Sequence, residues 1–243
     1  MLRRIGQLAT RAVHRASQIN VFVSPDLKRR YSVPGHTSWV VNESRLPADA
    51  IVSTLPQRQP GEPLRLAYLG RLAAEKDIPT LLRACALLDG VTLRLIGAGP
   101  QREPLEQLVQ ELGLQNRVTF HGAVAWGPDL FALLRQHHVL VLPSLTEGLP
   151  LVLSEGMSQG LVAVGSRVGG IPDLIEDGRN GLLFTPGRAP ELAAQLSRLR
   201  DDPALLSRLG MASLETARAN TLDKQQLNMF AALARYRAAL TRQ

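Results

Sequence analysis

From Leu64 onward the chain alternates short apolar runs with amphipathic stretches of helical length, and this alternation limits the possible folds more than any other feature. The apolar runs are short and nearly continuous, as in LRLAYLG at 64–70 and VTLRLIG at 91–97. Strands that are apolar on both faces are typical of parallel sheets covered by helices on each side. The sequence therefore predicts an α/β fold built on a parallel sheet with helices on both faces.

The predicted elements follow one another in regular alternation. Strands are expected at 64–70, 91–97, 117–122, 138–144, 161–166 and 181–184, and helices at 78–88, 101–113, 128–136, 150–159 and 171–176. Three further helices near 189–201, 203–219 and 222–241 close the chain, and Pro203 suits the first turn of one of them. Before the sheet, the pattern predicts a helix within 1–19 and two short strands at 21–23 and 39–41.

One segment interrupts these patterns. Residues 53–63, STLPQRQPGEP, hold three prolines and one glycine without periodicity, which is typical of a linker or an exposed loop. We therefore expect three parts: a small amino-terminal unit at 1–52, a linker at 53–63, and the main domain with its terminal helices at 64–243.

The charge and the cysteine content limit which partners and which cellular compartment are expected for this chain. The formal net charge is +7, but the basic residues are scattered and aromatic residues make up only 4%, so a nucleic-acid partner is not expected. The single cysteine, Cys85, excludes an internal disulfide and fits a reducing, cytoplasmic location. It lies in an apolar run, which favours a buried structural thiol.

No apolar run reaches the roughly 18–20 residues that are needed to span a bilayer. The first 19 residues carry four arginines and no acid. This pattern favours an ordinary amphipathic helix, and it leaves open a transit peptide or peripheral contact with an anionic membrane surface.

Glycine-rich turns recur where the predicted strands end. They occur at 70–71, 97–99, 122, 144–148 and 165–170. In open parallel sheets, ligands bind beyond the carboxyl ends of the strands, so these turns predict one shared binding site. The pair Gly97 and Gly99 is only a fragment of a dinucleotide fingerprint, because the third glycine is missing and Pro100 breaks the pattern.

Two glutamates, Glu147 and Glu155, lie on either side of a turn that becomes a helix. Gly148 in this turn lets backbone approach a ligand closely. A helix that begins near Pro150 would leave free amides for a phosphate, around Leu149, Leu151 and Val152. Carboxylates accept hydrogen bonds from diols, such as those of a sugar or a ribose. The alternative is structural: Ser144 and Glu147 would form a capping box, and Glu155 would be a solvated helix residue.

Cations follow the first strand of the main domain. Arg71 and Lys76 in GRLAAEK would stabilise the charge on a leaving pyrophosphate together with helix amides and without a metal. The alternative is that both are surface side chains paired with Glu75 or Asp77.

Two other features carry weaker signals. Gly169 and Gly170 would bring amides near a sugar or phosphate, or simply form a tight turn. The five histidines do not show metal-ligand spacing. His121 lies at a strand end and would line the cleft or serve a structural role, and His137 and His138 are expected to pack.

Several motifs together resemble the retaining glycosyltransferases of family 4, which have the GT-B fold with two Rossmann-like domains. The motifs are Gly70-Arg71-Leu72 with Lys76, Gly97-Ala98-Gly99, Phe120-His121-Gly122, Pro143-Ser144 through Glu147-Gly148-Leu149-Pro150 to Glu155, Gly169-Gly170-Ile171-Pro172, and Asp177-Gly178 with Asn180-Gly181-Leu182-Leu183. The resemblance covers roughly 64–243 well and 1–52 less clearly.

The resemblance implies a role for each matching residue. Arg71 and Lys76 would contact the donor diphosphate, Glu147 the donor sugar and Glu155 the ribose, with retention at the anomeric carbon. Neither a metal nor a cofactor is implied, and the nucleotide-sugar is the substrate. Arg71, Lys76 and Glu147 form the predicted catalytic group. The predicted donor-binding group is Gly70, Gly97, Gly99, Gly148, Leu149, Leu151, Val152, Glu155, Gly169 and Gly170.

The chain departs from the family pattern mildly at Asp77, Gly156 and Val162, where glycine, alanine and proline are usual. A larger departure is that 1–52 resembles only the tail of the family's amino-terminal acceptor domain. Transfer needs an acceptor held close to the donor with water excluded, so the resemblance implies a separate acceptor-domain partner or a longer protein.

Four hypotheses for the function follow from these observations and are compared by the sequence features that each requires. The first is a glycosyltransferase, and the second is a nucleotide-sugar-binding module or remnant without transfer activity of its own. A nicotinamide-dependent oxidoreductase would need a complete glycine fingerprint and an acid about 20 residues further on, and neither is present. A GT-B relative such as an epimerase or phosphorylase is the fourth, although no lysine here suits pyridoxal chemistry.

Overall fold

A computed structural model describes residues 19–22, 25–34, 36–40 and 44–240 of the chain. The predicted first helix and its arginines therefore lie almost wholly outside the described residues. None of the described helices is both long enough and apolar enough to cross a membrane.

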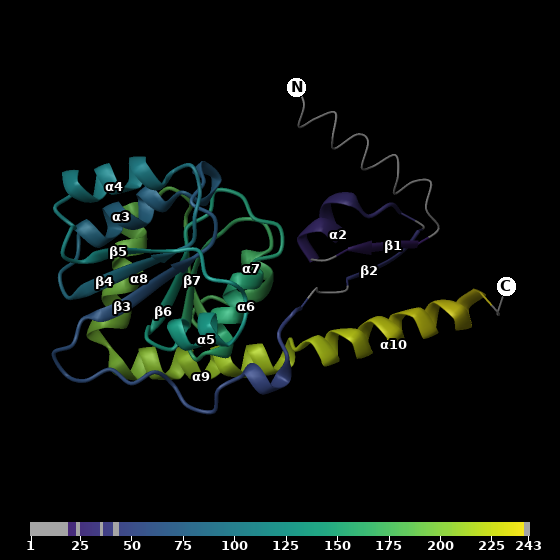
Figure 1. Cartoon of the computed structure of the whole chain (residues 1–243). Helices are drawn as coiled ribbons and strands as arrows, with labels where there is room; N and C mark the ends of the chain where they lie inside the picture. The colour runs from purple at the N-terminus through teal and green to yellow at the C-terminus, as the bar shows by residue number, and fades with distance from the viewer. Residues whose placement is uncertain (1–18, 23–24, 35, 41–43, 241–243) are drawn as a thin grey trace, which may run out of the picture.

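The main sheet has six strands, and every neighbouring pair is parallel (Figure 1). Its order is β5-β4-β3-β6-β7-β8. The predicted fold class is confirmed, and each strand lies within or next to its predicted range. The bounds are β3 (Leu64–Leu69), β4 (Val91–Ile96), β5 (Val118–Gly122), β6 (Val139–Leu142), β7 (Val162–Ser166) and β8 (Gly181–Phe184).

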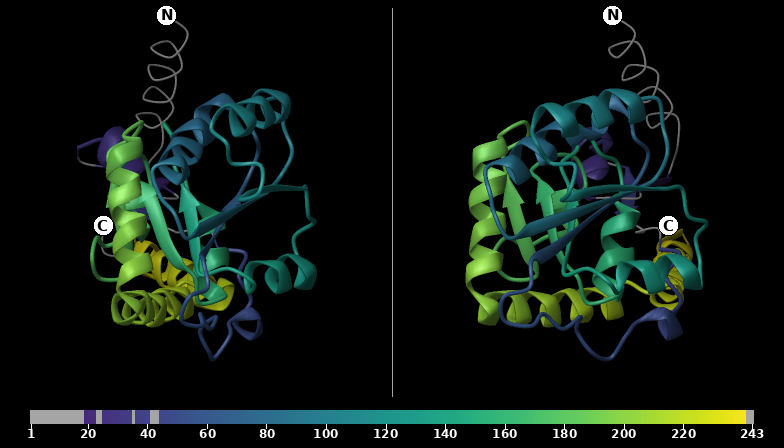
Figure 2. Two further views of the ribbon diagram at one scale, coloured as in Figure 1. Left: turned by 90° about the vertical axis from the view of Figure 1, so that its left-hand side faces the viewer. Right: turned by 60° about the vertical axis from the view of Figure 1, so that its left-hand side comes forward.

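Helices cover both faces of this sheet. On one side α3 packs against α4 and α8, and on the other side α6 packs against α5 and α9 (Figures 1 and 2). This layering follows from the strands themselves, because all four residues of β6 and of β8 are buried. The bounds are α3 (Ile78–Ala86), α4 (Arg102–Glu111), α5 (Pro128–Leu134), α6 (Leu151–Ser158), α7 (Ile171–Leu174), α8 (Ala189–Asp201) and α9 (Pro203–Ala219).

The start of α9 is defined by a proline and a side-chain cap. Pro203 occupies its first turn as predicted, and the Asp202 carboxylate accepts the backbone N–H of Leu205 at 2.9 Å. This cap satisfies one of the amides that a helix start leaves unpaired. A last helix, α10 (Leu222–Leu240), continues beyond α9 and extends past the main sheet (Figure 1).

The amino-terminal unit is a parallel pair of strands, β1 (Ile19–Phe22) and β2 (Thr37–Val40), joined through α2 (Pro25–Tyr31). Both strands begin two residues earlier than the sequence pattern predicts. The unit contacts the main domain through an ion pair between Arg29 and Asp173 at 3.1 Å. A short 3₁₀ turn, η1 (Ala48–Ala50), leads from this unit toward the main domain.

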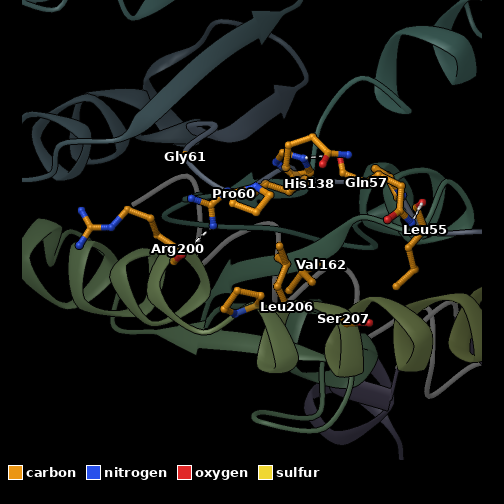
Figure 3. A pocket seen from close by; sticks show the side chains of 14 residues that line it. Leu55, Gln57, Pro60, Gly61, His138, Val162, Arg200, Leu206 and Ser207 are labelled. Atoms are coloured by element: carbon orange, nitrogen blue, oxygen red, sulfur yellow. Dashed lines mark hydrogen bonds between the residues drawn. The ribbon is translucent and has the colours of Figure 1, made fainter.

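The segment at 53–63 contains neither helix nor strand, as the prolines predict, but it is held firmly in place. The guanidinium of Arg58 donates to the carbonyl of Arg200 at 2.6 Å, and that of Arg65 donates to the carbonyl of Gln57 at 3.1 Å. The buried ring of His138 also contacts the Gln57 carbonyl, at 3.2 Å (Figure 3). A cavity of about 430 Å³ lies between this segment, β7 and the start of α9.

Candidate functional site

The order of the strands reverses between β3 and β6. The chain runs outward from β3 through β4 to β5 and then returns to the other side of β3 with β6. Where the loops after two neighbouring strands run in opposite directions, a crevice opens at the carboxyl ends of those strands. Ligands bind in this crevice in such folds. The loops that follow β3 and β6 hold Arg71, Lys76 and Glu147, so all three predicted catalytic residues lie at this point of the fold.

Lys76 and Glu147 form an ion pair across the crevice, with Lys76 Nζ 2.7 Å from Glu147 Oε2. Lys76 ends a single 3₁₀ turn, η2 (Ala74–Lys76), and the following Asp77 has a left-handed backbone with φ of 47°. The Ser144 hydroxyl also donates to Glu147 Oε2, at 3.1 Å. Two donors therefore hold one carboxylate oxygen, and Oε1 of Glu147 is left without a donor among the described residues.

The two loops are also joined through their backbones. The N–H of Leu145 donates to the carbonyl of Glu75 at 2.9 Å. The buried Ser166 hydroxyl at the end of β7 donates to the carbonyl of Ser144 at 2.5 Å. Such cross-loop hydrogen bonds fix the site before any ligand arrives, which lowers the entropy cost of binding.

Arg71 forms an exposed ion pair with Glu75 one turn further along. This is the pairing that the structural alternative predicts for Arg71, whereas Lys76 pairs with Glu147 instead. An exposed pair contributes about 1 kcal/mol or less, so a phosphate group would replace Glu75 at little cost. The carbonyl of Arg71 accepts a hydrogen bond at 2.8 Å from the hydroxyl of Tyr68, a buried residue of β3 that the sequence analysis did not single out.

Free amides are concentrated in the loop after β6. Among the described residues, the N–H groups of Thr146 to Leu149 and of Val152 have no acceptor within the protein. The prediction for Leu151 is wrong in this respect, because its N–H donates to the carbonyl of Leu149 at 3.0 Å. The tight geometry at Pro150, which precedes α6, brings these two groups together. No side chain caps α6, so Ser144 and Glu147 do not form a capping box.

The paired glycines have a packing role that sequence reasoning missed. A Cβ on Gly97 would lie 1.9 Å from the carbonyl oxygen of Gly70, and one on Gly169 would lie 1.8 Å from that of Glu147. Gly99 and Gly170 are restricted in the same way by Leu72 and Gly148. These glycines let neighbouring loops pack backbone to backbone and so hold Arg71 and Glu147 in place. Their direct contact with a donor stays a prediction.

Gly148 is different, because a Cβ there would meet no atom within 4 Å. The residue is exposed and flanked by free amides. Open space beside unpaired amides is what close backbone approach by a ligand requires.

Glu155 lies on the second turn of α6 and is half-buried. Burial raises the pKa of its carboxyl group, while the nearby Trp126 indole and the charge of Arg45 act in the opposite direction. Glu155 is therefore not the solvated residue of the structural alternative. A partly desolvated carboxylate with few partners is the kind of group that accepts hydrogen bonds from a ligand.

The described cavities do not enclose the ion pair. A cavity of about 400 Å³ borders the same loops, and Leu149, Leu151 and Gly170 help to line it. Arg71, Lys76, Glu147 and Glu155 are absent from its lining. Contacts between the two loops bring Lys76 and Glu147 together, whereas Arg71 pairs with Glu75 of its own loop.

The histidines divide into two groups. His121 is exposed at the end of β5. His137 and His138 are buried, and burial lowers the pKa of each to about 4. Within the described ranges, the acids, histidines and the cysteine form no group that could hold a metal ion.

Known proteins share both the sequence and the fold. The family described as "Glycosyl transferases group 1" matches residues 63–202, which is more than half of the chain. The lipopolysaccharide core biosynthesis glycosyltransferase LpsD of Rhizobium meliloti is 31% identical over 210 residues, covering 85% of this chain and 60% of that protein. The sulfoquinovosyl transferase SQD2 of Arabidopsis thaliana is 30% identical over 220 residues, covering 84% of this chain and 42% of that protein.

Two solved structures have the same architecture. Sucrose-phosphate synthase from Thermosynechococcus elongatus superposes with a TM-score of 0.82 at 27% identity, over 96% of this chain and 62% of that one. Anabaena HepE in complex with UDP gives 0.81 at 21% identity, over 94% of this chain and 68% of that one. The chain thus spans less than two thirds of the length of the curated relatives named above. By sequence and fold together, it belongs to the group 1 glycosyltransferases, which have the GT-B fold.

Proposed function

We propose that this chain binds a nucleotide-sugar at the crevice between β3 and β6 and takes part in moving the sugar to an acceptor. The Lys76–Glu147 ion pair at the strand-order reversal carries this proposal. It places a cation, a carboxylate oxygen without a donor and a row of free amides within one pair of loops. Anabaena HepE, which has the same fold, has been solved with UDP and with UDP-glucose, and this supports the proposal.

Each group has a separate task in this mechanism. Free amides at Gly148 and Leu149, with Lys76 and Arg71, would bind the diphosphate and stabilise the charge that grows on it as it leaves. Glu147 Oε1 would accept a hydrogen bond from a hydroxyl of the donor sugar. Glu155 would accept hydrogen bonds from the ribose diol, because a carboxylate can accept two at once.

In the transfer step, the bond between the anomeric carbon and the diphosphate oxygen breaks, and the acceptor hydroxyl oxygen bonds to the same carbon. The acceptor's proton passes to the departing diphosphate, so charge and atoms balance. The family resemblance implies that the new bond has the configuration of the old one. It also implies that this chain's own cations do the work that a metal does in other transferases.

Transfer also requires an acceptor in contact with the anomeric carbon. Because the chain spans at most 60% of LpsD and 42% of SQD2, we propose that an acceptor domain comes from a partner protein or from a longer form of this chain. A second possibility, a binding module without transfer, predicts nucleotide binding but no product.

Isothermal titration with UDP, GDP and ADP tests the first step, and one of them is expected to bind. Glu155→Ala should weaken that binding while the thermal melting curve stays unchanged, and equal affinity would contradict the ribose assignment. Proton NMR of a reaction with a nucleotide-sugar and the candidate acceptor-domain protein then tests transfer. Retention predicts a product anomeric coupling that matches the donor. Binding without transfer or donor hydrolysis would favour the binding module.

A further inference from the structure

The cavity of about 430 Å³ beside the segment at 53–63 lies at the amino ends of β6 and β7. His138 directly precedes β6, and Val162 begins β7. The crevice of the proposed function lies at the carboxyl ends of the strands, so the cavity is at the opposite end of the sheet. Its volume is in the range of about 300–1,000 Å³ that is typical of small-molecule sites.

The walls of this cavity are held in place by contacts within the protein. A Cβ on Gly160 would lie 3.0 Å from Pro56 Cδ, so the segment at 53–63 packs directly on the turn before β7. His138 accepts the N–H of Arg65 at its Nδ1, at 3.0 Å, and its Nε2 contacts the Gln57 carbonyl at 3.2 Å. Both ring nitrogens are therefore occupied, and His138 serves as a wall. A cavity that is formed in advance lowers the entropy cost of binding.

The charged residues that line the cavity are both arginines, and no acid is among its lining residues in the described part of the chain. One of them, Arg200, is paired, with its Nε 2.7 Å from Asp201 Oδ1. Hydrogen bonds from Arg200 and Ser197 lower the pKa of Asp201 to about 2, and the charge of Arg58 adds a smaller contribution. The Asp201 carboxylate is therefore engaged by Arg200 and Ser197.

The other arginine, Arg58, is half-buried and has only neutral hydrogen-bond partners. Its Nε donates to the carbonyl of Glu62 at 3.0 Å, and its Nη1 donates to the carbonyl of Arg200 at 2.6 Å. Across the described ranges, Arg58 forms no ion pair and its Nη2 has no acceptor. A half-buried guanidinium without an anionic partner favours an anion beside it, and its fork suits a carboxylate or phosphate.

Much of the remaining wall consists of aliphatic side chains and prolines. Figure 3 shows Arg200 at one end of the cavity and Leu55 at the other, with Val162 and Leu206 between them. Because Arg58 is bonded to the carbonyl of Arg200, the cation belongs to the Arg200 end. The cavity thus has a cationic end and an apolar body.

We propose that this cavity binds a small organic anion with an aliphatic body. Its anionic group accepts a hydrogen bond from Arg58 Nη2, and its body covers Val162, Leu206 and Leu55. This inference does not depend on the proposed function, because the nucleotide-sugar site lies at the other end of the strands. A neutral molecule of the same shape would leave the guanidinium without an anion, and an inorganic anion would leave the aliphatic wall uncovered.

Hexanoate is a suitable probe, with 1-hexanol as its neutral match and inorganic phosphate as the anion without an aliphatic body. Saturation-transfer NMR on the whole chain compares their affinities. We expect hexanoate to bind at millimolar concentration, and 1-hexanol and phosphate to bind at least about tenfold more weakly. Equal binding of hexanoate and 1-hexanol would overturn the inference, and so would a lack of hexanoate binding.

Variants at Ser207, an exposed residue of α9 that lines the cavity, test its location. Ser207→Glu supplies an internal anion near Arg58 and should weaken hexanoate binding at least about tenfold. Ser207→Gln has nearly the same shape without the charge and should bind hexanoate like wild type. Both should keep the melting temperature, because the position is exposed and near the start of a helix. Equal hexanoate binding by the two variants would overturn the inference.

Two further variants separate this cavity from other apolar surface. Arg58→Gln should weaken hexanoate binding about tenfold. If Arg58→Gln loses its fold, the Ser207 pair and the 1-hexanol comparison still decide the outcome. Phe230→Ser is the control, because Phe230 is an exposed apolar side chain of α10 that is not part of the cavity. Hexanoate binding that is lost in Phe230→Ser would place the probe on α10 and would overturn the inference.

Discussion

Lys76 and Glu147, 71 positions apart in the sequence, meet at 2.7 Å where the loops after β3 and β6 face each other. Both side chains are largely buried, with exposures of 20% and 13%. A charge in such a place needs its partner, because leaving the other charge unpaired costs more than the pair itself contributes. The Lys76–Glu147 pair therefore holds the two loops together and also keeps a cation and a carboxylate in the crevice between them.

Replacing Lys76 with methionine should destabilise the fold by roughly 1–3 kcal/mol, since Glu147 then keeps a poorly solvated negative charge. The double variant Lys76→Met with Glu147→Gln removes both charges and should recover much of that stability. Nucleotide-sugar turnover with the acceptor-domain partner should stay at least about 100-fold reduced in both proteins. Urea unfolding and product NMR measure the two effects. Recovery of turnover in the double variant would contradict a direct role for these groups.

Arg71→Ala should leave stability nearly unchanged, because the Arg71–Glu75 pair is exposed and worth about 1 kcal/mol or less. Its effect should appear in binding, with a much larger loss for a nucleoside diphosphate than for the nucleoside. Calorimetric titration with both ligands gives the comparison. Arg102→Ala is a matched control, because Arg102 forms a similar exposed pair with Glu106. Equal losses for nucleoside and diphosphate would argue against a phosphate contact.

Alanine substitutions at two glycines of the site, Gly169 and Gly148, should have different effects on stability and similar effects on binding. Gly169→Ala introduces a Cβ at 1.8 Å from the Glu147 carbonyl oxygen on a backbone with φ of 52°, so we expect a lower melting temperature and weaker binding together. Gly148→Ala meets open space and should keep the melting temperature while still weakening nucleotide-sugar binding. Differential scanning calorimetry and titration measure both variants. Full binding by Gly148→Ala would show that no ligand approaches this backbone closely.

Stability should fall as the pH drops from about 6.5 toward 4, the interval between the unfolded and folded pKa values of His137 and His138. The unfolded chain takes up protons in this range, whereas burial keeps both folded rings neutral, so protonation favours unfolding. A shift of this size corresponds to roughly 3 kcal/mol per residue as an upper bound.

His138→Gln should flatten the pH dependence, and it should also lower stability at neutral pH, because the Nδ1 acceptor for the N–H of Arg65 is lost. His121→Gln is the matched control, because this histidine is exposed at the end of β5. Chemical unfolding at a series of pH values makes the comparison. A pH profile of His138→Gln that matches wild type would contradict the buried neutral ring.

The sequence by itself determined the order and type of nearly every element from Leu64 to Leu240, because each arises from local periodicity and from local stop signals such as Pro203. It also placed Arg71, Lys76 and Glu147 at one edge, since parallel strands all end on the same side of a sheet. Only the tertiary structure decided that Lys76 pairs with Glu147 while Arg71 pairs with Glu75, and that Gly97 and Gly169 serve loop packing.

Local sequence patterns also could not show how the segment at 53–63 is held. Its prolines indicated a loop, but they did not indicate that Arg58 and Arg65 would hold it through hydrogen bonds to backbone carbonyls. It also explains the free amide wrongly expected at Leu151, which depends on the local geometry after Pro150. Periodicity reports which face of an element is buried, whereas these contacts join residues that only the folded chain brings to within 3 Å or so of each other.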